Sequence, residues 1–159
     1  MIKKILNNNL ILIVLIMFMF IRFDVKKQRI INEYKLLKYN NHLFMQVTLN
    51  KKLCLLIIDS GSGKSFIDIS KSKVFKFKYI EFGNQKFVGI GGISQMYIIY
   101  DYTISNIQNE FMGVNLEQLT NYMKENFGTT LEIVGILGTD FLVNHNAILN
   151  YKNNTIIYN

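Results

Sequence analysis

The chain has 159 residues, of which half are hydrophobic and 18% are charged. This composition excludes an intrinsically disordered protein, and the length fits one domain with a short appendage. Because Cys54 is the only cysteine, an intramolecular disulfide and a zinc site built from cysteines are excluded. We expect no metal and no other cofactor.

The net charge of +7 is unevenly distributed. Residues 1–30 carry six Lys and Arg against one Asp, whereas residues 31–159 carry twelve basic and ten acidic residues. A nucleic-acid-binding surface requires the basic excess on the folded domain. Here the excess flanks an apolar segment, which favours a membrane and argues against a nucleic-acid partner.

That apolar segment comprises residues 10–21, twelve consecutive apolar side chains. As a helix they reach about 18 Å, short of a bilayer core of about 30 Å, and extension to residues 5–23 gives nineteen positions. No small-residue cleavage site follows, so we predict an uncleaved signal-anchor over residues 1–23. A cleaved signal and a buried helix are the alternatives. We expect a charged linker over residues 24–40 and a folded domain over residues 41–159 on the extracytoplasmic side.

The first half of the domain has the hydrophobic patterns of β-strands. Residues 43–50 alternate, and residues 53–58 (LCLLII) form a short apolar run typical of a buried strand. Residues 74–82 alternate apolar and charged side chains, which predicts a strand with one buried face. Residues 86–102 predict a hairpin whose glycine-rich tip is residues 89–92.

The second half contains the two helices that we predict. Asn115 and Gln118 form a capping-box pattern, apolar residues then recur at helical spacing, and Gly128 ends the helix. A strand is expected at residues 131–134, a short helix at 140–145, and a closing hairpin from residues 147–151 and 155–158. The prediction is an all-β fold with two short helices, arranged as a small barrel.

The chemistry depends on residues 53–67 (LCLLIIDSGSGKSFI), for which two interpretations are possible. Gly63-Lys64-Ser65 suggests a phosphate-binding loop, but that motif needs glycine where Ile58 stands, and no clear helix follows. The alternative assigns the chemistry to Asp59, a carboxylate at the end of a buried strand beside hydroxyls and glycines. A lone Asp-Ser-Gly can also merely cap a turn.

Other segments strengthen the second interpretation. Asp59-Ser60-Gly61, followed by residues 65–68 (SFID), resembles the active-site loop of retropepsin-like aspartic proteases. Residues 88–92 (VGIGG) resemble their flap. Residues 135–142 (GILGTDFL) and 145–151 resemble their C-terminal signature. This resemblance covers residues 42–158 and implies the closed β-barrel of the acid-protease fold.

The resemblance also implies residue roles. Asp59 is the catalytic carboxylate, and because the chain has one such motif, the second comes from an identical chain in a homodimer. The loop is supported by the Ser60 hydroxyl, the tight turn at Gly61, and a hydrogen bond from Ser62 to the carboxylate. The expected substrate-binding flap consists of Gly89, Ile90, Gly91 and Gly92.

The sequence thus predicts a membrane-anchored aspartic endopeptidase acting on protein or peptide substrates. A catalytically inactive relative that binds peptides or assembles at the membrane is the alternative, and a nucleotide-dependent membrane enzyme is disfavoured. The remaining candidate residues are expected to be structural. Cys54, His42 and His145 are assigned to packing, Asp68 and Asp101 to the surface, and Asp140 to a helix cap or an ion pair.

Overall fold

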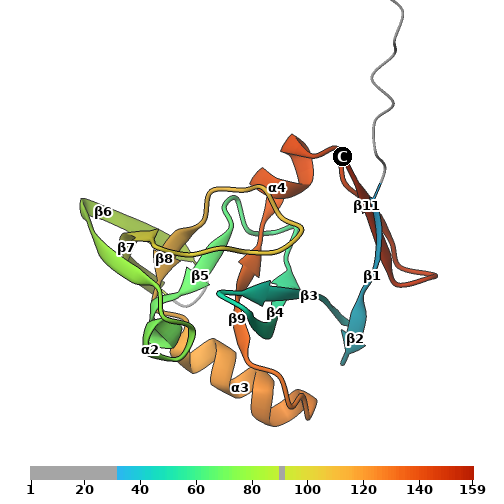
Figure 1. The fold of residues 1–159 in the computed structure, drawn as a ribbon, viewed down its shortest axis with the longest axis horizontal. Helices are drawn as coiled ribbons and strands as arrows, with labels where there is room; N and C mark the ends of the chain where they lie inside the picture. The colour runs from blue at the N-terminus through green and yellow to red at the C-terminus, as the bar shows by residue number, and fades with distance from the viewer. Residues whose placement is uncertain (1–31, 90–91) are drawn as a thin grey trace, which may run out of the picture. The chain divides into compact units, whose positions relative to one another are not determined.

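The computed structural model describes residues 32–89 and 92–159 (Figure 1). The predicted anchor, residues 1–23, and the flap residues Ile90 and Gly91 lie outside the described residues. Within the described ranges, no helix is long and apolar enough to cross a membrane.

The described unit is mainly β-structure, as predicted. The strands are β1 (Asn32–Lys35), β2 (Leu37–Tyr39), β3 (His42–Leu49), β4 (Lys52–Ile58), β5 (Phe66–Asp68), β6 (Lys78–Gly89), β7 (Gly92–Tyr100), β8 (Met112–Val114), β9 (Ile133–Leu137), β10 (Ile148–Asn150) and β11 (Thr155–Tyr158). The helices are the 3₁₀ helix η2 (Ile69–Lys71) and the α-helices α2 (Ser72–Phe75), α3 (Glu117–Phe127) and α4 (Thr139–Asn144). Strands β1 and β2 lie in the segment predicted as a linker, so the folded part begins before residue 41.

The described strands form two sheets. One has eight strands in the order β2-β3-β4-β9-β5-β8-β7-β6, and the other has the order β1-β11-β10. Among the described residues β2 and β6 are therefore edge strands, and the mainly β fold is confirmed without the closed barrel that was predicted with it. Strand β6 is exposed along most of its length and carries Lys, Glu, Asn and Gln, which suits an edge strand rather than barrel closure.

Strand β9 lies between β4 and β5, although β4 and β5 are consecutive in the chain. It pairs parallel to β4 and antiparallel to β5. The approach to β5 requires Gly135, because a Cβ there would lie 2.0 Å from the main-chain oxygen of Phe66. The predicted strand at 131–134 is therefore shifted to Ile133–Leu137, with a glycine in its centre.

The apolar run of β4 is explained by burial on both faces of the sheet. Cys54 and Leu56 belong to the larger hydrophobic core, as expected for Cys54. Leu55 and Ile57 belong to a second core, which includes Met123 of α3. Desolvation by this burial raises the pKa of the Cys54 thiol to about 12, although a main-chain hydrogen bond opposes the shift.

The two predicted helices are confirmed, with shifted ends. Helix α3 begins two residues after Asn115, whose side-chain oxygen accepts a hydrogen bond from the Glu117 N–H (3.0 Å). It ends at Gly128, where φ is +66°. Helix α4 begins at Thr139, one residue before the predicted start.

Residues 74–82 differ from the prediction of one strand. The segment starts in α2, Lys76 takes a left-handed conformation with φ +58°, and β6 begins at Lys78. The turn is held by a distant residue, because the Asn50 side-chain amide donates to the carbonyls of Phe75 (2.9 Å) and Lys76 (3.2 Å), while Phe75 and Phe77 are both buried in the main core. Tertiary packing therefore overrides the alternating pattern.

Asp68 is also placed differently from its predicted surface position, because its side chain is 0% exposed. Its carboxylate accepts hydrogen bonds from the Ser70 N–H (3.1 Å), the Leu116 N–H (3.0 Å) and the Thr120 hydroxyl (2.9 Å). A buried carboxylate is tolerated when it is hydrogen-bonded in this way. Asp68 thereby joins η2 to the start of α3. Asp101 is exposed, as predicted, and pairs with Lys78.

Candidate active site

Asp59 immediately follows β4 and opens a tight turn. Its N–H donates to the Leu137 carbonyl (3.1 Å), and its own carbonyl accepts from the Ser62 N–H (3.2 Å). One carboxylate oxygen, Oδ1, accepts from the Gly61 N–H (2.8 Å). Because Asp59 is only partly buried, the turn leaves this oriented carboxylate accessible to solvent.

The three residues after Asp59 have different surroundings. Ser60 and Gly61 are exposed, whereas Ser62 is buried. The Ser62 hydroxyl donates to the Lys64 carbonyl (2.7 Å), so the predicted hydrogen bond from Ser62 to the Asp59 carboxylate is not formed. The carboxylate is held by the main chain at Gly61 instead.

The far end of the same loop is attached to the start of α4. The Thr139 N–H and hydroxyl both donate to the Ser62 carbonyl (2.8 and 3.0 Å). Gly138 makes this approach possible, because a Cβ there would lie 2.4 Å from the Lys64 carbonyl oxygen. The conformation of residues 62–64 thus depends on contacts with residues more than seventy positions away.

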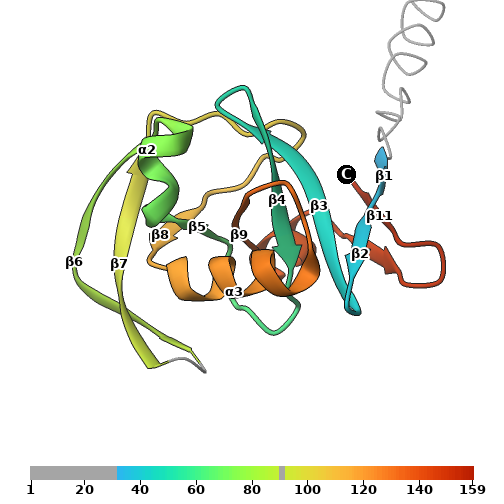
Figure 2. The same ribbon diagram turned by 90° about the horizontal axis from the view of Figure 1, so that it is seen from below.

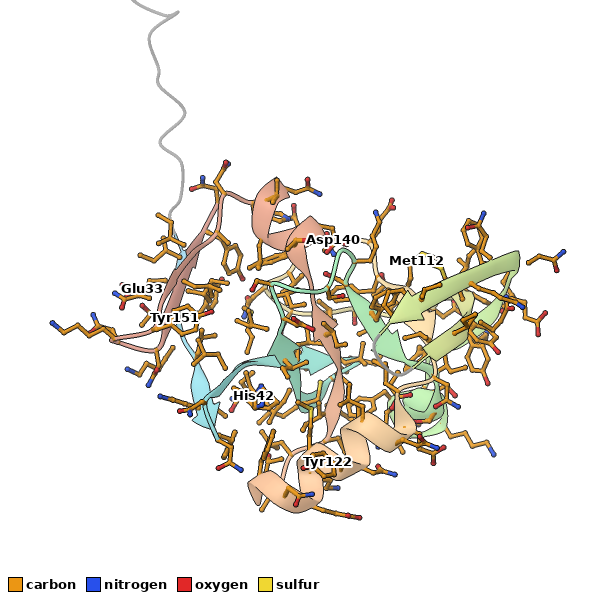
Figure 3. The ribbon with its side chains drawn as sticks, turned by 180° about the vertical axis from the view of Figure 1, so that it is seen from behind. Glu33, His42, Met112, Tyr122, Asp140 and Tyr151 are labelled. Atoms are coloured by element: carbon orange, nitrogen blue, oxygen red, sulfur yellow. The ribbon has the colours of Figure 1, made fainter. Side chains whose placement is uncertain are left out.

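The strongest of these contacts joins Ser65 to Asp140, which Figure 3 shows at the start of α4. The Ser65 hydroxyl donates to Asp140 Oδ1 (2.6 Å), and the Ser65 N–H donates to Oδ2 (3.0 Å). The same hydroxyl accepts from the Gly138 N–H (2.9 Å). Asp140 also accepts a hydrogen bond from the Phe141 N–H, a local contact at the start of the helix. Its bond to Ser65 is not predicted from the sequence. No local pattern reveals a partner 75 positions away.

These hydrogen bonds determine the ionisation of Asp140. Burial raises the pKa of its carboxyl, but hydrogen bonds from the Ser65 hydroxyl, the main-chain N–H groups of Ser65 and Phe141, and Asn109 outweigh burial. The pKa is therefore lowered from its ordinary value. Asp140 stays charged and binds the loop through charge-assisted bonds.

We expect Asp140→Asn to destabilise the fold in a pH-dependent way. At pH 6 the loss should be on the order of 1–2 kcal/mol, because two bonds to an ionised acceptor are weakened. Since the folded pKa is lowered, the stabilisation by Asp140 is present above the unfolded value of about 3.9 and is lost as pH falls through the folded value. Urea unfolding of both proteins at pH 6 and pH 3 should show the difference shrinking. An equal difference at both pH values would contradict a charged Asp140, and the exposed Asp101→Asn serves as control.

The β6–β7 hairpin confirms the predicted two-stranded segment with a turn around residues 89–92. Gly89 pairs with Gly92, whose φ is +110°, a conformation that favours glycine. Figure 2 shows the distal ends of β6 and β7 on the same side of the molecule as the turn after β4. Among the described residues, no hydrogen bond joins Gly89 or Gly92 to that turn.

Asp59 does not line either of two depressions in the surface. The larger, about 590 Å³, is lined by polar residues that include Lys64 and Asp140. The smaller, about 320 Å³, lies beside η2 and the start of α3. The Asp59 carboxylate is thus presented on an open turn rather than at the bottom of either depression.

Comparison with known proteins yields likeness at the level of structure only. No protein-family model matches the sequence, and no curated protein matches it. The EIAV protease in complex with the inhibitor HBY-793 has 18% identity and a TM-score of 0.47, covering 68% of this chain and 93% of that one. A retropepsin-like aspartic protease from Rickettsia conorii has 10% identity and a TM-score of 0.47, covering 80% of this chain and 90% of that one. The chain is similar in fold to retropepsin-like proteases, and what its Asp59 turn does chemically depends on its own residues.

Proposed function

We propose that the protein is an aspartic endopeptidase whose active form is a homodimer. The observation that carries this proposal is the Asp59 turn, in which a partly exposed carboxylate is oriented by the Gly61 N–H. The loop is fixed from behind by the Ser65–Asp140 pair. Within residues 32–89 and 92–159 the turn is exposed at Ser60 and Gly61, and in the proposed dimer a second copy brings its own Asp59 to this side.

Two carboxylates that share one proton divide the work of peptide hydrolysis. One acts as a general base on a water molecule, and the other donates a proton to the carbonyl oxygen of the scissile bond. Each chain contains a single Asp-Ser-Gly, so a two-fold axis supplies the second carboxylate. The substrate would bind as an extended strand beneath the β6–β7 hairpin, with Gly89 to Gly92 at its tip.

The test is peptidase activity of the full chain and of Asp59→Asn against a mixture of unstructured peptides. We expect Asp59→Asn to lose at least about 10²–10⁴-fold in activity, because the acid and base groups are removed. Folding should survive, since Asn nearly preserves the size of the side chain. Asp101→Asn is the matched control, because that carboxylate is exposed and paired only with Lys78.

Two outcomes would contradict the proposal. Full activity in Asp59→Asn would place the chemistry elsewhere. A wild-type chain that binds peptides without cleaving them would indicate a peptide-binding or assembly module instead.

We also propose that residues 1–23 anchor the domain in a membrane, with the domain on the extracytoplasmic side. The support is the apolar run at residues 10–21 and the basic residues that flank it. Deleting residues 1–23 should release the protein from membranes into the soluble fraction. If the shortened protein still pellets with bilayers after a high-salt wash, the anchor is assigned wrongly.

A further inference from the structure

The distal part of the β6–β7 hairpin, residues 86–89 and 92–95, has few attachments to the rest of the unit. The ladder between β7 and β8 includes Tyr97 and Ile98 and does not extend to residues 92–95. The distal residues pair with one another, from Lys86 with Gln95 to Gly89 with Gly92. The Gln95 side chain also bonds within the hairpin, to the carbonyls of Gly83 and Met96.

One aromatic contact connects this distal part to the body of the sheet. The rings of Phe87 and Phe66 lie 4.6 Å apart between centroids, at 61° to one another. Edge-to-face pairs of this kind stabilise beyond the area that they bury. Among the described aromatic pairs, it is the one that crosses from the distal hairpin to another element.

The two partners differ in how firmly they are held. Phe66 is 0% exposed, and its backbone pairs with Ile136 on one side and Met112 on the other. It directly follows Ser65, the residue that Asp140 fixes. Phe87 instead depends on the hairpin, where its neighbour Val88 is 73% exposed and faces away from the body. Phe66 is therefore held on both sides of its strand, whereas Phe87 is partly buried and its backbone is paired only within the hairpin.

Gly89 leaves room for the Phe87 ring. Residues 87 and 89 project from the same face of β6, and a Cβ at position 89 would lie 2.8 Å from Phe87 Cε1. A side chain there would have to displace the ring. The glycine thus contributes space for this contact as well as backbone freedom at the tip.

We propose that Phe87 is a positioning residue, whose ring on Phe66 holds the distal hairpin beside the strand that leaves the Asp59 loop before substrate binds. The effect of Phe87 on catalysis rests on the proposed peptidase function, in which the ordered hairpin lies over the path of the substrate. Losing the contact frees the distal hairpin without touching Asp59. The expected effect on catalysis is a KM several-fold higher, with kcat less affected, because binding rather than chemistry is weakened.

The primary test is amide hydrogen exchange in the full-length chain, comparing wild type with Phe87→Ala, Phe87→Leu and Phe82→Ala. Phe82 lies on the same strand and is 38% exposed, which makes it the matched control. We expect Phe87→Ala to raise the amide exchange rate about tenfold at residues 86–89 and 92–95, because the variant loses both the aromatic pair and the apolar surface that the pair buries. Phe87→Leu should restore part of the protection, and Phe82→Ala should change little.

The outcomes are separable. Equal exchange in Phe87→Ala and wild type, or equal increases in Phe87→Ala and Phe82→Ala, would overturn the proposal. A rise that extends to β4 and β9 would also overturn it, because Phe87 would then support the whole fold. Amide exchange can be measured in a chain without peptidase activity. Absence of activity would therefore refute the proposed function, while the exchange rates alone decide whether Phe87 positions the hairpin.

Discussion

Wild-type chains that are refolded together with a ninefold excess of Asp59→Asn chains are expected to lose about nine-tenths of their activity per wild-type chain. With random pairing, about one wild-type chain in ten meets another wild-type chain, and only that pair holds two carboxylates. The result depends on the proposed dimer, in which Asp59 of each chain meets its copy at the exposed turn of Ser60 and Gly61. The measurement is the initial rate of peptide cleavage at constant wild-type concentration.

An equal mass of an unrelated, inert protein is the control for this mixing experiment. Refolding from denaturant ensures that the chains exchange partners. If the excess of Asp59→Asn leaves the rate per wild-type chain unchanged, each chain holds a complete site, and the shared pair of carboxylates is refuted. If the rate rises, Asp59→Asn chains support catalysis by their partners, which also excludes a requirement for two ionisable groups.

Gly138→Ala is expected to lower the free energy of unfolding by on the order of 3 kcal/mol, because overpacking against main-chain atoms cannot be relieved by a side-chain rotation. A Cβ at this position would lie 2.4 Å from the Lys64 carbonyl oxygen and 2.8 Å from that of Ser62. Residues 62–64 would have to move away, and the bonds from Thr139 to Ser62 would be lost. Activity should fall with stability, since the same loop carries Asp59.

Gly63→Ala is the matched control on that loop. No atom lies within 4 Å of a Cβ at position 63, and Gly63 is not among the glycines with positive φ. We expect a change within about 0.5 kcal/mol. Urea unfolding of the two variants measures the contrast. Equal effects would mean that the loop is not packed against β9 and α4 as the structure has it.

Local sequence was sufficient for several parts of this protein. The apolar run before Asp59, the capping pattern at Asn115 and the stop at Gly128 each depend on residues within a few positions, so β4 and α3 could be predicted. The hairpin around Gly89 and Gly92 was predictable for the same reason. The motif resemblance further singled out Asp59 as the candidate catalytic residue, a role that stays a prediction.

Only the tertiary structure decided what surrounds Asp59. The insertion of β9 between β4 and β5 joins segments some eighty positions apart in sequence, and hydrophobic periodicity does not identify a strand's partner. The bonds of Asp140 to Ser65 and of Asp68 to Thr120 likewise depend on distant donors, which the residues next to each carboxylate do not reveal. The alternating pattern at residues 74–82 predicted one strand, but hydrogen bonds from the distant Asn50 side chain to the carbonyls of Phe75 and Lys76 hold a turn there. Local patterns specify which face of an element is apolar, whereas the packing of distant elements determines which polar groups meet.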